Sequence, residues 1–319
     1  MQMERAAQRG TPVIRSGGRS RRVLRAGLAA TAFLATSSAG LSAYVGWRMT
    51  HPAHRFGEIT PANAGLAYEQ VEFPSAQGGL ILRGWFMPGD GTSTVILAHG
   101  YAMHRMGDSA ALPLAALLVE HGYNVLAFDF RGHGRSDGRL VSLGFYEKHD
   151  ILGAIAYLRR RFAPRQPAIG LLGFSMGAAT ALEAIALAPD EIRAVVSDSA
   201  YADLHGYLRE HISIWSRLPR VPFNWLILQV AQLLTRVRAR EVSGLRALAR
   251  TPDVPVLFIA GTADTLIPHE HTVHLHRVSG AVGERLWLVD GADHVQAFDR
   301  QPGPYGERIL AFFDRHLRA

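Results

Sequence analysis

Short apolar, strand-like runs alternate with helical patterns through most of this chain. The runs lie at 68–73, 80–86, 95–98, 125–128, 169–172, 194–197, 256–260 and 286–289. Helical patterns follow from about the third run onward, near 112–121, 146–162, 176–187, 271–278 and 305–317. Parallel strands are joined through helices that cover the sheet. The alternation therefore predicts an α/β fold with a mostly parallel, eight-stranded sheet and helices on both faces.

The fifth run leads directly into the sequence Gly-Phe-Ser-Met-Gly at 173–177, and a helical pattern follows it. A strand, a tight GxSxG turn and a helix form a nucleophile elbow, in which the serine has a strained backbone. Small residues are needed two positions before and after the serine, because strand and helix pass closely there. Gly173 and Gly177 occupy these positions around Ser175, which predicts a nucleophilic serine.

A nucleophilic serine needs a base to take its proton and an acid to orient that base. Asp264 lies just past the seventh run, and His294 lies in the loop after the eighth. The predicted triad is therefore Ser175, Asp264 and His294. Asp198 also ends a strand and is the alternative acid, whereas Asp293 is expected to be a loop residue.

Ser175, Asp264 and His294, in this chain order, resemble the triad of the α/β-hydrolase superfamily. The resemblance covers about residues 68–317. It includes His99-Gly100-Tyr101, which looks like the family's oxyanion loop, and the sequence Asp-Phe-Arg-Gly-His-Gly-Arg-Ser at 129–136. Within the superfamily the chain looks most similar to the monoacylglycerol-lipase-like and serine-aminopeptidase-like branch. The resemblance implies that the backbone N–H groups of Tyr101 and Met176 form the oxyanion hole. His99 and His133 are expected to shape loops.

Residues 201–251 do not fit the alternation, because a helical pattern without a strand fills the space between the sixth and seventh runs. The superfamily commonly inserts a cap at this place. The segment 223–234, read as a helix, is apolar on nearly every face and needs burial on more than one side or contact with an apolar ligand. Two interpretations stay open, a lid that presents apolar surface to an acyl chain and a cap helix packed on the domain.

Residues 1–55 contain nine arginines and one acid, Glu4, while the rest of the chain is nearly balanced in charge. The formal net charge of +7 therefore belongs to an N-terminal tail. A nucleic-acid-binding protein would carry its basic excess on the folded domain. We therefore expect no nucleic-acid partner.

An uncharged stretch of 22 residues, 26–47, follows the basic tail at 1–25 and is long enough to span a bilayer. Arginines on its N-terminal side place the N-terminus in the cytoplasm and the hydrolase domain, 68–319, across the membrane. Residues 48–67 are expected to form a linker. The alternatives are export with cleavage near Ser37-Ser38-Ala39, with a partial twin-arginine pattern at 20–24, and a soluble N-terminal helix.

The predicted function is a membrane-anchored or exported serine hydrolase that cleaves carboxylic esters, including lipid-like acyl esters, through an acyl-enzyme. A peptidase, an amidase or an acyltransferase on the same triad, and a catalytically silent scaffold, are the alternatives. An aminopeptidase would need an acidic group for the free amine, for which Glu210 and Glu241 are candidates. No cofactor or metal is expected, and the histidines at 269–276, with His271 and His274 one turn apart, are interpreted as a solvated helix.

Overall fold

The computed structural model describes residues 17–280 and 285–318. Its centre is one eight-stranded sheet in the order β1-β2-β4-β3-β5-β6-β7-β8. The strands are β1 (Glu69–Pro74), β2 (Ile81–Met87), β3 (Thr94–Ala98), β4 (Asn124–Phe128), β5 (Ile169–Phe174), β6 (Ala194–Asp198), β7 (Val256–Gly261) and β8 (Leu286–Val289). β2 pairs antiparallel with β1 and with β4, and all later neighbours are parallel. The predicted mostly parallel sheet is confirmed.

Burial explains why the central strands read as continuous apolar runs. Every residue of β3, β4, β5, β6 and β7 is buried, because helices cover both faces. The edge strand β1 instead alternates buried and exposed residues over its second half. Central strands, buried on both faces, are therefore mostly apolar, whereas the edge strand alternates apolar and polar residues.

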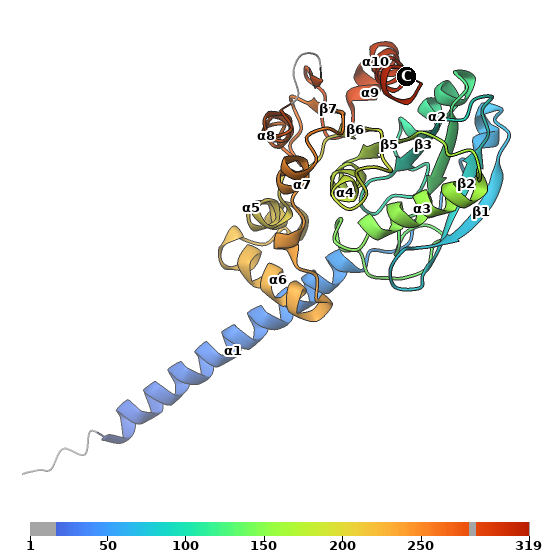
Figure 1. Cartoon of the computed structure of the whole chain (residues 1–319). Helices are drawn as coiled ribbons and strands as arrows, with labels where there is room; N and C mark the ends of the chain where they lie inside the picture. Colours follow the sequence, from blue (N-terminus) through green and yellow to red (C-terminus); the bar gives the residue numbers. More distant parts are fainter. Residues whose placement is uncertain (1–16, 281–284, 319) are drawn as a thin grey trace, which may run out of the picture.

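Two apolar clusters, one on each face of the sheet, form the core. The first joins the sheet to α3 (Lys148–Arg161), α4 (Met176–Ile185) and α8 (Glu270–Val278). The second joins it to α2 (Ala111–Glu120), α9 (Ala297–Arg300) and α10 (Pro302–Leu317). Figure 1 shows the strands between these helices. The expected helices on both faces are confirmed.

A helical cap lies between β6 and β7, as predicted. It consists of α5 (Leu204–Ser216), α6 (Arg220–Thr235), the 3₁₀ turn η2 (Ala239–Glu241) and α7 (Gly244–Arg250). Ile227 and Leu228 of α6 are buried, while Trp225 and Leu233 on the same helix are exposed. One part of the apolar segment 223–234 is therefore buried, and the other part forms an exposed apolar surface.

The long N-terminal helix α1 (Gly17–Thr50) extends away from the domain, and its last turns lie against α6 (Figure 1). It contains the uncharged stretch 26–47 and continues to Thr50, so the first residues of the expected linker are helical. The 3₁₀ turn η1 (Pro61–Ala64) follows before β1. Most of the basic tail at 1–25 lies outside the described residues.

Candidate active site

The site lies where the parallel strands β3, β5, β7 and β8 end. Loops after these strands contain Tyr101, Ser175, Asp264 and His294. Carboxyl ends of parallel strands meet at one edge of a sheet, and ligands of open α/β sheets bind there. Residues far apart in the sequence are therefore brought into one site.

Ser175 occupies a strained turn between β5 and α4. Its backbone has φ 53° and ψ −113°, a conformation that non-glycine residues rarely adopt. A Cβ at Gly177 would lie 2.0 Å from the carbonyl oxygen of Ala98, and one at Gly173 would lie 2.6 Å from the Cα of Ala178. Only glycine fits at either position, which agrees with the GxSxG pattern.

The three residues predicted as a triad form one hydrogen-bonded chain. Nε2 of His294 lies 2.9 Å from Oγ of Ser175, and its Nδ1 lies 2.7 Å from Oδ2 of Asp264. The other carboxylate oxygen of Asp264 accepts hydrogen bonds from the backbone N–H groups of Leu266 and Ile267. The acid is buried and held at both oxygens, so it orients the imidazole toward the serine.

Asp198, the alternative acid, faces other partners. Its carboxylate accepts hydrogen bonds from the hydroxyls of Tyr305, at 2.6 Å, and Ser199, at 2.8 Å. Burial raises its pKa to about 6. Asp293 accepts backbone N–H groups from His294 and Thr265, which is a loop-forming role. The geometry thus favours Asp264 as the partner of His294.

The loop after β3 is held by a buried carboxyl group that the sequence analysis did not identify. Oδ2 of Asp108 accepts the backbone N–H of Gly100 at 3.1 Å. Burial raises the pKa of Asp108 to about 7. Nothing in the local sequence pattern around Asp108 signals that it holds Gly100.

Met176 is the first residue of α4, so its N–H has no partner within the helix and lies at the positive end of the helix dipole.

His99 and His133 join the loop that contains Tyr101 to the loop at 129–136. Nε2 of His99 accepts the N–H of Phe130 at 3.0 Å, and Nε2 of His133 accepts the N–H of Ala102 at 3.1 Å. Burial lowers the pKa of His99 to about 3 and that of His133 to about 4. Both imidazoles are therefore neutral at pH 7 and act as loop-shaping groups.

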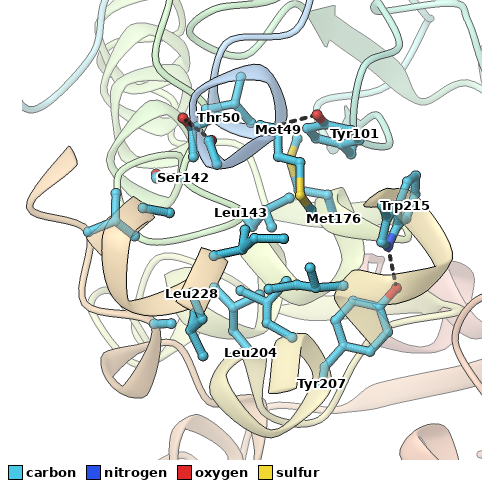
Figure 2. Close-up of a pocket in the computed structure, with 18 of the residues that line it drawn as sticks. Met49, Thr50, Tyr101, Ser142, Leu143, Met176, Leu204, Tyr207, Trp215 and Leu228 are labelled. Carbon is cyan, nitrogen blue, oxygen red and sulfur yellow. Dashed lines mark hydrogen bonds between the residues drawn. The ribbon is translucent and has the colours of Figure 1, made fainter. Parts of the chain in front are cut away.

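An apolar cavity of about 100 Å³ opens beside Ser175, under the cap. Figure 2 shows Leu204 and Tyr207 of α5 with Leu228 of α6 on one side of it, and Met49 and Thr50 of α1 on another. Trp215 donates its indole N–H to the hydroxyl of Tyr207 at 3.3 Å (Figure 2). The contribution of α1 to this cavity was not predicted, because it joins segments far apart in the chain.

Within residues 17–280 and 285–318, no Asp, Glu, Lys or Arg side chain lines this cavity. Glu210 instead faces Arg220 at 3.8 Å, and Glu241 binds Arg238 at 2.8 Å, both at the surface. Neither acid is therefore in place to bind the free amine of a peptide. The lining suits an uncharged, apolar group.

The histidine-rich stretch forms part of α8. Nδ1 of His271 accepts the backbone N–H of Ala202 at 3.3 Å, and the ring lies near those of Tyr207 and His211. In the part of the chain that the structure describes, no group of three or more His, Cys, Asp or Glu side chains is placed to hold a metal ion.

Comparisons with known proteins agree with this fold. A family model described as the alpha/beta hydrolase fold matches residues 93–226. The uncharacterized protein YqkD of Bacillus subtilis is 31% identical over 258 residues, which cover 78% of this chain and 81% of YqkD. The chain belongs to the α/β-hydrolase family. The resemblance to the α/β-hydrolase superfamily is confirmed.

Other relatives of this α/β hydrolase include named enzymes. The human serine hydrolase BPHL is 29% identical over 264 residues, covering 76% of this chain and 83% of BPHL. The structure of the Pyrococcus furiosus esterase Pf2001 matches with a TM-score of 0.69 and 28% identity, over 83% of this chain and 99% of the esterase. The fold and these relatives support hydrolase activity on a small-molecule substrate.

Proposed function

We propose that this α/β hydrolase is a serine esterase that cleaves carboxylic esters with an apolar acyl group. His294 takes the proton of Ser175 as the serine oxygen attacks the ester carbonyl, and Asp264 stabilises the imidazolium that forms. The protonated His294 then gives its proton to the departing alcohol. Water, activated by the same histidine, hydrolyses the acyl-enzyme. The hydrogen-bonded chain from Ser175 through His294 to Asp264 is the observation that carries this proposal.

The negative oxygen of the tetrahedral intermediate would be bound by the N–H groups of Tyr101 and Met176. One such donor typically lowers the barrier by about 3 kcal/mol. Asp108 supports the first donor indirectly, because it holds the N–H of the preceding residue, Gly100. The N-terminus of α4 supports the second through its dipole.

The apolar cavity under the cap favours an acyl ester over a charged peptide. Its lining offers burial to a hydrocarbon chain and, within the described ranges, no carboxylate to an amine. The named esterase among the structural relatives points the same way. Peptidase, amidase and acyltransferase activities on the same triad, or a silent scaffold, are the competing functions.

We further propose that α1 anchors the enzyme in a membrane. Among the described residues α1 is the one helix long and apolar enough to cross a bilayer. All residues from 21 to 37 are exposed, including Phe33 and Leu34. Arginines precede the span, so the N-terminus would be cytoplasmic and the hydrolase domain on the other side.

The test uses the full chain in phospholipid nanodiscs with p-nitrophenyl esters of increasing acyl length and a fluorophosphonate label. We expect turnover and labelling in the wild type, and loss of both in Ser175→Ala. The matched control is Ser109→Ala, which removes a surface hydroxyl bonded to Asp299 and should leave both readouts intact. A folded wild type that neither labels nor turns over would favour the silent scaffold, and turnover of amides alone would favour an amidase.

A further inference from the structure

The last turns of α1 are packed into the catalytic domain. Ser42 is fully buried, and a Cβ at Gly46 would lie 3.1 Å from the Cβ of Ala231 on α6. The two helices therefore meet almost backbone to backbone at Gly46. The earlier part of α1, residues 21–37, is exposed. The helix thus has two parts with different surroundings, and the second belongs to the hydrolase domain.

Hydrogen bonds fix this end of α1 to loops of the site. The carbonyl oxygen of Met49 accepts the hydroxyl of Tyr101 at 2.7 Å. The carbonyl oxygen of Thr50 accepts the backbone N–H of Val141 at 2.8 Å. Tyr101 also supplies the first oxyanion donor in the proposed mechanism. The position of α1 is therefore coupled directly to the loop that would bind the reacting oxygen.

The same turns form one wall of the apolar cavity beside Ser175. Gly46, Met49 and Thr50 line it from α1, opposite side chains of α5 and α6. Figure 2 shows Met49 reaching from α1 into the space where Tyr101 and Met176 also lie. A dry cavity of about 150 Å³ holds a benzene-sized ligand. The cavity here, at about 100 Å³, has room for a short acyl chain beside Met49.

We propose that α1 is a wall of the acyl-binding site as well as an anchor, and that Met49 sets the acyl-chain length the enzyme accepts. This inference rests on the proposed esterase function. The acyl chain of the substrate lies between the last turn of α1 and the cap helices α5 and α6. Its end contacts the Met49 side chain, which is flexible and fills irregular apolar space.

A smaller and a larger residue at position 49 should shift the preferred acyl-chain length in opposite directions. Met49→Ala removes three heavy atoms, which leaves room for roughly two or three more methylene groups, each adding about fourfold to kcat/KM when buried. The preferred ester should therefore become longer by about that many carbons. Met49→Phe puts a rigid ring into the same space and should move the preference to shorter esters.

The experiment compares kcat/KM of the full chain in nanodiscs for p-nitrophenyl esters from two to twelve acyl carbons. The matched control is Tyr44→Ala, because Tyr44 lies on the same helix and its side chain is 60% exposed. Opposite shifts in Met49→Ala and Met49→Phe, with the wild-type profile in Tyr44→Ala, are expected. Identical profiles in all four proteins would overturn the proposal.

A binding measurement separates this proposal from the esterase proposal. In Ser175→Ala the esters are bound without the serine nucleophile, and the p-nitrophenyl group quenches tryptophan fluorescence, to which Trp215 in the cavity contributes. We expect tighter binding of long esters when Met49→Ala is added to Ser175→Ala. Unchanged affinities would overturn the acyl-wall role whatever the activity. If the affinity shifts but the wild type hydrolyses no ester, the esterase proposal is wrong and the acyl-binding proposal still holds.

Discussion

At the scale of single residues, the site depends on which partner each buried polar group contacts. Asp264 lies in the loop after β7 and Asp198 is the last residue of β6, yet of these two acids only Asp264 hydrogen-bonds the imidazole of His294. Asp198 is satisfied by Tyr305 and Ser199. Asp108 is a third buried carboxyl group, and it holds the loop before Tyr101. The roles of these acids therefore differ although their residue type and burial are alike.

Asp264→Asn should lower kcat for ester hydrolysis by about 10³- to 10⁴-fold, because the amide favours the wrong imidazole tautomer. Asp198→Asn is the matched control and should lower kcat less than about tenfold, since its neighbours are hydroxyls rather than His294. Steady-state kinetics of both variants decide between the two acids. The reverse order of effects would make Asp198 the catalytic acid.

Asp108→Asn should reduce the pH dependence of stability. Burial raises the pKa of Asp108 to about 7 in the folded chain, against 3.8 for an ordinary aspartate. Between these values the folded chain holds a proton that the unfolded chain lacks, so the free energy of unfolding decreases as pH rises. The asparagine does not titrate and still accepts the N–H of Gly100.

We therefore expect the loss of stability from pH 5 to pH 8 to shrink by about 2–3 kcal/mol in Asp108→Asn. Urea unfolding at pH 5 and pH 8 measures the free energy of unfolding of both proteins. Asp90→Asn, at an exposed position, is the control and should keep the wild-type pH dependence. An equal pH dependence in Asp108→Asn and wild type would contradict the shifted titration of Asp108.

At the scale of elements, the close passage of β5 and α4 determines the backbone geometry of Ser175. Gly177 on α4 lies against the end of β3, and Gly173 on β5 lies against the start of α4. The missing side chains allow the helix to begin immediately after Ser175. The first N–H groups of α4 therefore lie directly after Ser175 in the chain, at the helix end where an anion is stabilised.

Gly177→Ala should destabilise the chain by several kcal/mol and abolish esterase activity. The added Cβ would lie 2.0 Å from a backbone oxygen, which has no freedom to move aside. Gly303→Ala is the matched control, because a Cβ at that position on α10 meets nothing within 4 Å. Thermal unfolding and ester turnover test the pair, and wild-type behaviour of Gly177→Ala would show that the turn can relax.

At the scale of the whole molecule, one helix belongs to two environments. The first part of α1 exposes apolar side chains with no covering element from the described chain, whereas its end lies between α6 and the site. Trp225 and Leu233 of α6 extend the exposed apolar surface next to this junction. This arrangement would place the cap at the membrane surface.

The chain contains no cysteine, so single cysteines report topology without background labelling. Asp90→Cys, in an exposed loop of the domain, should react with a membrane-impermeant maleimide in intact cells. Gln2→Cys, in the basic tail, should react only after permeabilisation. The opposite pattern would reverse the topology, and a shortened, released chain would indicate cleaved export.

Local sequence patterns predicted the α/β architecture, which is confirmed, and they singled out three residues that the structure joins by hydrogen bonds. The apolar runs at 169–172 and 256–260 became β5 and β7, because complete burial requires apolar residues on both faces. Ser175, Asp264 and His294 are candidates in the sequence because each follows an apolar, strand-like run. Each of these local patterns depends on residues that are neighbours in the chain.

The tertiary structure alone decided which distant groups meet. Three contacts join separate parts of the fold. They are the contact of Gly46 with Ala231, the hydrogen bond from Tyr101 to Met49 and the hydrogen bond from Gly100 to Asp108. No periodicity reports such pairs, because a side chain's partner depends on the packing of whole elements. The sequence therefore determined the fold class and the chemistry of the residues. Packing determined that the N-terminal helix closes the cavity in which that chemistry would occur.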